Sequence, residues 1–116
     1  MSKHKAVVER YFDGFRKSDH EQILACLTDH IVWDLAGSTQ LTGKAAFDRE
    51  IENEQFDGSP TLVVDRLVEE GDTVVAIGAG EATQRSGDPH RFAFVTVLTF
   101  AGNLIGRVDS YVVPLP

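Results

Sequence analysis

The order of secondary-structure signals along the chain is the feature that most constrains its fold. The first half carries helical patterns, and the second half carries four long runs of β-type sequence. These runs predict strands at 61–69, 73–84, 90–100 and 104–113, separated by short turns that contain glycine. Turns of this kind are typical of a meander of hairpins. Helices followed by consecutive hairpins favour an α+β fold with an antiparallel sheet.

Two helices are predicted before the first strand. Ser18 is expected to cap the second, short helix, with Glu21 three residues later as its capping-box partner. The first helix shows apolar residues at the i, i+3, i+4, i+7 spacing of an amphipathic helix. These residues are Val8, Tyr11, Phe12 and Phe15.

A strand and a third helix are predicted in the middle of the chain. The apolar run at 30–35 predicts the strand, and the residues at 36–39 predict a loop. Thr42 is expected to cap a helix at 43–55, and the turn-forming residues 57–60 are expected to end it.

Composition bounds the class of protein. A length of 116 residues predicts a single domain, 1–116. The net charge of −7 argues against binding of nucleic acid, which depends on neutralising phosphates, and against binding to anionic membranes. Cys26, the only cysteine, is interpreted as a buried, inert thiol, and a cysteine-rich metal site is excluded. Without a signal core or a long apolar run, the chain is expected to be cytoplasmic.

The last predicted strand carries the residues that most suggest chemistry. Side chains alternate across a strand, so Arg107, Asp109 and Tyr111 are expected to share one side with Ile105. If this row faces a cavity, it forms an acid/base site with its own counter-charge. If it faces water, it is a surface ion pair worth less than about 1 kcal/mol. The opposite side of the strand would carry Leu104, Val108 and Val112.

Several short segments, taken in this order, resemble one superfamily. They are Ala6-Val7-Val8-Glu9-Arg10-Tyr11, Ile31-Val32-Trp33-Asp34 followed by Gly37, Leu41-Thr42-Gly43-Lys44-Ala45-Ala46, and Asp109-Ser110-Tyr111. The chain resembles the NTF2-like (cystatin-like) superfamily of ketosteroid isomerase, limonene epoxide hydrolase and the SnoaL-like polyketide cyclases. The resemblance implies a cone, with three N-terminal helices packed on a curved, mostly antiparallel sheet and a pocket at the open end.

The resemblance also tests one known mechanism. Aligned without gaps, Tyr11 falls where the isomerases place their oxyanion-hole tyrosine. Leu35 falls where they place the proton-shuttling aspartate, and Thr96 where they place a protonated aspartic acid. Steroid isomerisation by that mechanism is therefore not expected. A one-residue slip would turn Asp34 inward, but it would also turn Trp33 outward.

The same alignment implies a set of pocket residues. Asp109 would be the general base or acid, Arg107 would orient it and stabilise charge, and Glu81 or Tyr11 would assist. A Glu81–Arg107–Asp109 cluster would resemble in kind the Asp–Arg–Asp constellation of limonene epoxide hydrolases; the alternatives are a structural ion network and a core tyrosine. The pocket wall would be formed by Trp33, Leu35, Ile77, Ala79, Phe92, Phe94, Thr96 and Tyr111.

These residues favour a cofactor-free and metal-free function. We expect acid/base chemistry on a small apolar molecule, polyketide-, terpenoid- or steroid-like: isomerisation, cyclisation or hydration. The alternative is a non-catalytic small-molecule-binding or dimerisation module. The histidines show no metal-ligand spacing. His90 is interpreted as a surface residue, and the alternative is a position at the pocket rim. A homodimer is expected through an apolar outer sheet face formed by Leu104, Val108, Val112, Ala93, Val95 and Val97.

Overall fold

The computed structural model describes residues 2–51 and 56–116, and these residues form an α+β structure, as predicted. Three helices and six strands are described. In chain order they are α1 (Lys3–Lys17), α2 (His20–Leu24), β1 (Leu27–Leu35), β2 (Thr39–Thr42), α3 (Lys44–Ile51), β3 (Phe56–Glu70), β4 (Thr73–Gln84), β5 (Pro89–Ala101) and β6 (Leu104–Pro114).

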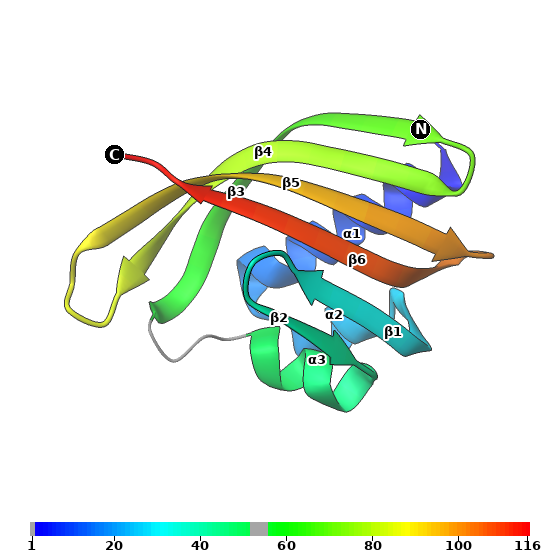
Figure 1. The fold of residues 1–116 in the computed structure, drawn as a ribbon, viewed down its shortest axis with the longest axis horizontal. Helices are drawn as coiled ribbons and strands as arrows, with labels where there is room; N and C mark the ends of the chain where they lie inside the picture. The colour runs from blue at the N-terminus through cyan, green and yellow to red at the C-terminus, as the bar shows by residue number, and fades with distance from the viewer. Residues whose placement is uncertain (1, 52–55) are drawn as a thin grey trace.

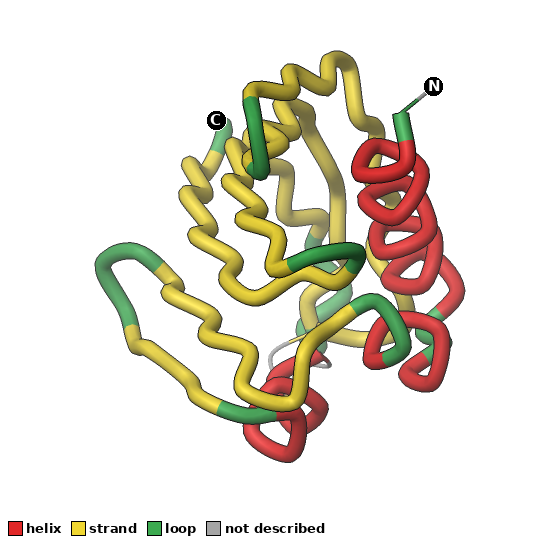
Figure 2. Tube along the Cα trace, turned by 90° about the vertical axis from the view of Figure 1, so that its right-hand side faces the viewer, coloured by secondary structure: helices red, strands yellow, loops and turns green. Residues whose placement is uncertain are grey.

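The six strands form one curved sheet in the order β2-β1-β6-β5-β4-β3. Neighbouring strands are antiparallel except β1 and β6, which run parallel. The helices lie on one side of this sheet, with α1 behind the long strands and α3 beside β1 and β2 (Figure 1; Figure 2). We call this side the helix-covered face and the opposite side the outer face.

The core lies between the helices and the helix-covered face. Directly paired residues of neighbouring strands share a face, so the pairs Ala76–Thr96 and Thr96–Ser110 put all three residues on the helix-covered side. Apolar side chains in line with them are buried against the helices because removal of their surface from water stabilises the fold. The buried residues include Val8, Tyr11, Phe12, Ile31, Trp33, Phe47, Val74, Phe94, Leu98 and Val108.

The connection between α1 and α2 differs from the predicted one. Ser18 ends α1 in the left-handed conformation, with φ of 51°, and therefore cannot cap the next helix. Asp19 caps α2 instead, and its Oδ1 accepts a hydrogen bond of 3.1 Å from the Gln22 backbone N–H. The two helices pack closely there: a Cβ at Gly14 would lie 2.6 Å from Ile23 Cγ1. A short left-handed connection permits this approach.

One of the two segments predicted as loop or turn lies within a strand. The predicted loop at 36–39 is confirmed for residues 36–38, which connect β1 to β2, and its last residue, Thr39, begins β2 and pairs with Leu35. The predicted turn at 57–60 lies inside β3, where the register shifts between Asp57 and Thr61 and Gly58 has a φ of +72°. The turn residues therefore form an irregularity in a long strand. Of the helix predicted at 43–55, residues 44–51 are helical and 52–55 lie outside the described residues.

Candidate functional site

The sheet separates the predicted site residues into two groups. Burial and strand pairing place six of them on the helix-covered face and six on the outer face. The first group is Tyr11, Trp33, Leu35, Phe92, Phe94 and Thr96. The second is Ile77, Ala79, Glu81, Arg107, Asp109 and Tyr111. The prediction that all twelve residues line one pocket is therefore wrong, because the predicted residues on β4 and β6 point to the outer face.

A β-bulge at Gly106 explains the facing of β6. Thr99 pairs with Arg107, but Phe100 pairs with Ile105, so Gly106 is an extra residue in this strand. Ile105 and the residue three positions later, Val108, are consequently both buried on the helix-covered side. Strict alternation from Ile105 placed Arg107, Asp109 and Tyr111 on the wrong face. The glycine within the strand was the available signal.

Aromatic rings explain the facing of β4. Gly78 and Gly80 are directly opposite Phe94 and Phe92, and a Cβ on either glycine would lie within 3 Å of the facing ring. The rings need this space, so β4 turns its glycines inward and Glu81 outward, with Ile77 and Ala79. Glu81 is exposed and pairs across the strands with Arg91, so no Glu81–Arg107–Asp109 cluster forms.

The interior holds an aromatic cluster with one internal hydrogen bond. Trp33 stacks on Phe47 of α3, with ring centroids 4.2 Å apart, and Phe15 of α1 meets the indole edge-on. The indole Nε1–H donates a 2.9 Å hydrogen bond to Ser110 Oγ of β6. This bond joins β1 to β6 across the helix-covered face and fixes the orientation of the indole ring.

Tyr11 lies in the same cluster. Its ring has edge contacts with Phe12, Phe15 and Phe47, and only 2% of the residue is exposed. Burial raises the pKa of the Tyr11 hydroxyl far above its usual range, and Cys26 adds a smaller effect in the same direction. The hydroxyl therefore stays protonated at physiological pH and offers a neutral hydrogen-bond donor in an apolar environment.

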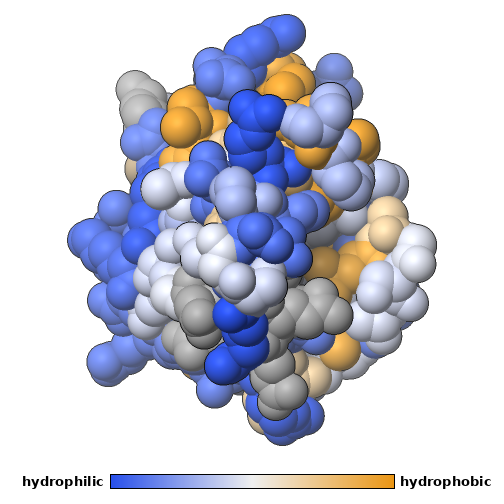
Figure 3. All heavy atoms as spheres, turned by 90° about the vertical axis from the view of Figure 1, so that its left-hand side faces the viewer, coloured by the Kyte–Doolittle hydropathy of each residue, from blue (hydrophilic) through white to orange (hydrophobic). Residues whose placement is uncertain are grey.

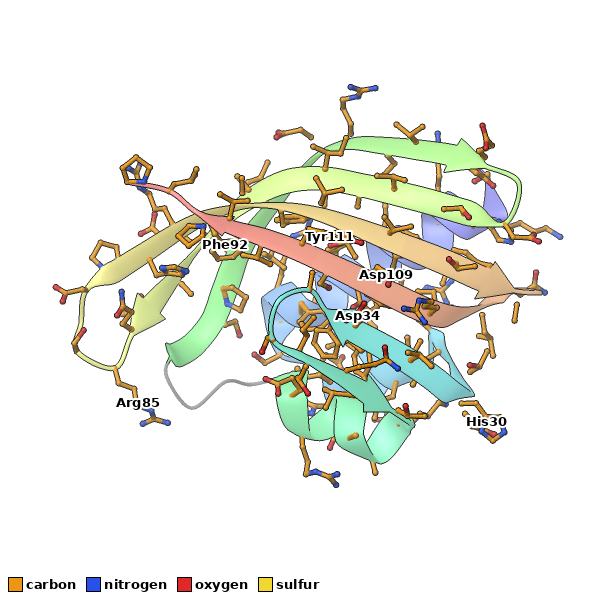
Figure 4. The ribbon with its side chains drawn as sticks, viewed as in Figure 1. His30, Asp34, Arg85, Phe92, Asp109 and Tyr111 are labelled. Carbon is orange, nitrogen blue, oxygen red and sulfur yellow. The ribbon has the colours of Figure 1, made fainter. Side chains whose placement is uncertain are left out.

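The outer face carries a cluster of three charged residues. Arg107 Nε lies 3.1 Å from both Asp109 carboxylate oxygens, and Nη2 lies 3.0 Å from Oδ1. The same Nη2 lies 3.6 Å from Asp34 Oδ2 on β1, where Asp34 pairs directly with Asp109 (Figure 4). The side chains of Asp34, Arg107 and Asp109 are 36%, 43% and 18% exposed. The hydrogen bond that the guanidinium donates to Asp109 raises the pKa of Arg107, with a smaller contribution from Asp34.

This Asp–Arg–Asp cluster differs from the predicted one in its third member. The sequence alignment turned Asp34 away from the pocket and placed Glu81 beside Arg107 and Asp109 instead. The parallel pairing of β1 with β6 brings Asp34 to Arg107. Asp34 and its paired residue Asp109 are 75 positions apart, so no short sequence pattern indicates their contact. Only the register of β1 against β6 reveals that Asp34 lies beside Arg107.

His90, predicted to be a surface residue, is partly exposed and partly buried. It is two residues before Phe92 on β5, and its ring stacks with that of Phe92 at 5.7 Å. Another histidine, His20, contacts Asp48 through Nδ1 at 2.5 Å. Over residues 2–51 and 56–116, no group of three or more His, Cys, Asp or Glu side chains could hold a metal ion.

A groove of about 520 Å³ lies between α1 and β3, and the sequence did not predict it. Its apolar lining includes Val8, Phe12, Val64 and Leu67, and charged residues of both signs surround them. The groove occurs where β3 has an irregular register between Val64 and Arg66. None of the predicted site residues lines it.

The outer face presents an apolar surface beside the charged cluster. Val63, Val68, Val95, Tyr111 and Val113 are all exposed, and pairing through β3 to β6 places them on one face. Ala93, Val95 and Val97 lie on this face as predicted. Val108 does not, because the bulge at Gly106 buries it inside, and Val112 pairs with the inward-facing Phe94.

Comparison with known proteins identifies the family. The family model of the SnoaL-like domain matches residues 8–108. The chain belongs to the SnoaL-like domain family. No curated protein matches the chain. In the part of the SnoaL-like chain that the structure describes, no helix is long and apolar enough to cross a membrane.

Solved structures show the same fold. An NTF2-like protein from Burkholderia pseudomallei superposes with a TM-score of 0.85 at 21% identity, over 96% of this chain and 91% of that one. TerC, co-crystallised with polyporic acid, gives 0.85 at 22% identity, over 95% and 91%. An epoxide hydrolase from M. tuberculosis, similar to limonene epoxide hydrolase, gives 0.84 at 15% identity, over 96% and 83%. The predicted NTF2-like fold is confirmed.

Proposed function

We propose that this SnoaL-like domain binds one small, largely apolar molecule between its helices and the helix-covered face of the sheet. The observation that carries the proposal is the interior composition: rings of Phe15, Trp33 and Phe47 surround neutral hydrogen-bonding groups. Apolar walls with a few convergent polar groups are the usual form of a small-molecule site.

The ligand class follows from the polar groups. Tyr11 offers a hydroxyl that stays protonated, and Ser110 offers a hydroxyl held by the indole of Trp33. Neutral donors stabilise a carbonyl or hydroxyl oxygen without the desolvation cost of a buried charge. We therefore assign a polyketide-, terpenoid- or steroid-like ketone or alcohol as the ligand. Donors of this kind also stabilise an enolate-like intermediate, which makes isomerisation or cyclisation the first chemistry to assay.

The experiment compares a ketone with a hydrocarbon of the same shape. Carvone and limonene share one terpenoid skeleton, and the fluorescence of Trp33, the only tryptophan, reports their binding. We expect wild-type protein to bind carvone more tightly by about 2- to 10-fold, the effect of one hydrogen bond. Tyr11→Phe should abolish this preference.

The matched control is the second tyrosine of the chain. Tyr111 is 50% exposed on the outer face, so Tyr111→Phe should leave both affinities unchanged. Equal binding of carvone and limonene to wild-type protein, or loss of the preference in Tyr111→Phe as well, would contradict the assignment of Tyr11. Failure of both compounds to bind would remove interior ligand binding altogether.

Acid/base chemistry at Asp34, Arg107 and Asp109 is a second candidate function. The supporting observation is the geometry: one guanidinium contacts two carboxylates, and Asp109 is mostly buried. In the reaction we propose, Asp109 removes a proton from water as the water oxygen attacks an epoxide carbon. The carbon–oxygen bond breaks, and Asp34 passes a proton from solvent to the epoxide oxygen, so the product is a diol.

This candidate needs the outer face to be covered, because acid/base groups act most strongly away from bulk water. A second copy of the chain would provide the cover. The exposed apolar residues Val63, Val95 and Val113 on the same face support a homodimer through it. Light scattering at micromolar concentration should show a dimer, and Val95→Lys should produce a monomer. A monomeric wild-type protein would overturn the dimer.

Epoxide hydrolysis is tested separately from ligand binding. Limonene oxide is incubated with wild-type protein, Asp109→Asn and Glu81→Gln, and the diol is measured by gas chromatography. We expect diol from wild-type protein and from Glu81→Gln, because Glu81 lies opposite Arg91 and away from the cluster. Asp109→Asn should form none above the uncatalysed level. Absence of diol with wild-type protein would leave the interior site as the functional one.

A further inference from the structure

Three aromatic rings form a row on the helix-covered side of β5. Side chains two residues apart on a strand share a face, so the rings follow one another along the strand. Each ring is paired across to β4 with a residue that has a small side chain or none. The pairs are His90–Ala82, Phe92–Gly80 and Phe94–Gly78.

The two phenylalanine rings lie against the backbone of β4. A Cβ at Gly80 would lie 2.6 Å from Phe92 Cζ, and a Cβ at Gly78 would lie 2.8 Å from Phe94 Cζ. Rings that lean this far over the neighbouring strand direct one side toward its backbone. The other side of each ring is turned away from β4, on the helix-covered face.

Among the described side chains, a second ring covers Phe94 but not Phe92. Phe12 of α1 stacks on Phe94 with centroids 5.7 Å apart and an interplanar angle of 28°. The ring contacts of Phe92, among the described residues, are with its strand neighbours His90 and Phe94. Phe92 is only half-buried, while Phe94 is buried. The layer of rings that α1 provides therefore ends one position before Phe92.

The uncovered position lies at the end of the molecule beyond α1. Phe92 is on the part of β5 that extends toward the β4–β5 hairpin (Figure 4). Val112, which is 54% exposed, and Pro114 flank this part of β5 on β6. Seen from this end, hydrophobic atoms are exposed between hydrophilic ones (Figure 3).

We propose that a flat aromatic ring of the ligand stacks on Phe92, in the layer that Phe12 occupies above Phe94. An oxygen substituent of this ring would bind the imidazole of His90, which stacks at an interplanar angle of 29° to Phe92. Imidazole nitrogens both donate and accept hydrogen bonds, so a hydroxyl or a carbonyl fits. This inference rests on the proposed interior site and narrows its ligand class to flat, oxygen-bearing ring compounds.

The first test compares a flat ring system with a puckered one. 2-Naphthol and 2-decalol share two fused six-membered rings and a hydroxyl, and only naphthol is flat. Calorimetric titration of wild-type protein should show about 3- to 10-fold tighter binding of naphthol, the factor that one stacked aromatic pair provides. Phe92→Leu keeps an apolar side chain, removes the ring and should make the two affinities equal.

The second test addresses His90. His90→Phe retains a ring and removes both nitrogens, so the preference for 2-naphthol over 2-methylnaphthalene should fall by about 2- to 10-fold. His30→Phe is the matched control, because His30 is exposed on β1. It should change neither affinity.

The outcomes separate this inference from the proposed function. Equal binding of naphthol and decalol to wild-type protein, or an unchanged preference in Phe92→Leu, would overturn the stacking position. If carvone then still binds in a Tyr11-dependent manner, the interior site stands without it. An unchanged preference for the hydroxyl in His90→Phe would overturn the role of His90 alone.

Discussion

The polar side chains on the two faces of the sheet differ in charge. Around Trp33 on the helix-covered face the polar groups are neutral: the Tyr11 hydroxyl and the Trp33–Ser110 hydrogen bond lie among aromatic rings. On the outer face they are charged, and Asp34 and Asp109 share one guanidinium. Burial of an unpaired charge costs far more than burial of a hydrogen-bonded hydroxyl. The comparison teaches that this fold keeps ionised groups where water still reaches them.

The two tyrosines of the chain lie on opposite faces and differ in burial. Tyr11 is buried and held by three aromatic neighbours, whereas Tyr111 is half-exposed on a strand that faces outward. The interior is therefore expected to dominate stability, and the outer face to matter for association and charge.

Truncation of an interior ring should have the largest effect on stability. Phe47 is fully buried between Trp33 and Tyr11, so Phe47→Ala should lower the free energy of unfolding by about 4 kcal/mol. Val63→Ala, on the exposed outer face, should lower it by less than about 1 kcal/mol. Urea denaturation at one fixed protein concentration measures both. Similar losses would mean that the outer face contributes as much as the core.

The close approach of rings to β4 predicts a large penalty at one glycine and none at another. A Cβ at Gly78 would lie 2.1 Å from the Val63 carbonyl oxygen, so Gly78→Ala should cost about 3 kcal/mol. At Gly106 the nearest atom would lie 3.6 Å away, so Gly106→Ala should change stability by no more than about 1 kcal/mol. Thermal unfolding of both variants tests this. A well-tolerated Gly78→Ala would show that neither the Val63 carbonyl nor the Phe94 ring lies as close to this position as described.

Removal of the interior hydrogen bond should have an intermediate effect. Ser110→Ala leaves the Trp33 indole N–H without its partner in a buried position, which costs about 1–2 kcal/mol. The emission of Trp33 should also change, because its orientation depends on this bond. Ser86→Ala, in an exposed turn, serves as the control and should stay within about 0.5 kcal/mol of wild type. Unchanged Trp33 emission in Ser110→Ala would contradict this geometry.

Much of the fold was accessible from the sequence because its signals are local. Val8, Tyr11 and Phe12 follow helical spacing, and the glycine-containing turns at Gly71, Gly87 and Gly102 separate the four long strands. All three glycines have positive φ, which other residues rarely adopt. Short-range conformational preference therefore determined element type and order. The facing of β5 was also predicted correctly, because no bulge interrupts Phe92, Phe94 and Thr96.

The candidate site was less accessible because it depends on register. The extra residue Gly106 puts Arg107 and Asp109 on the opposite face from Ile105. A prediction that assumes strict alternation of side chains cannot detect such an insertion. The contact of Asp34 with Arg107 depends on the parallel pairing of strands far apart in sequence. The exchange of Ser18 for Asp19 as the α2 cap had a similar origin, because the close packing of α1 on α2 decided it.

Disruption of the outer ion cluster should have the smallest effect on stability, and salt should reveal its origin. Arg107 is 43% exposed, so Asp109→Asn should lower the free energy of unfolding by less than about 1 kcal/mol at low ionic strength. The distance beyond which mobile ions screen exposed charges falls from about 10 Å at 0.1 M salt to about 3 Å at 1 M, so the difference from wild type should shrink further at high salt. Ser110→Ala removes a buried, neutral hydrogen bond, and its cost should not change with salt. A salt-independent loss of several kcal/mol in Asp109→Asn would mean that the cluster is enclosed, as the proposed dimer requires for chemistry on the outer face.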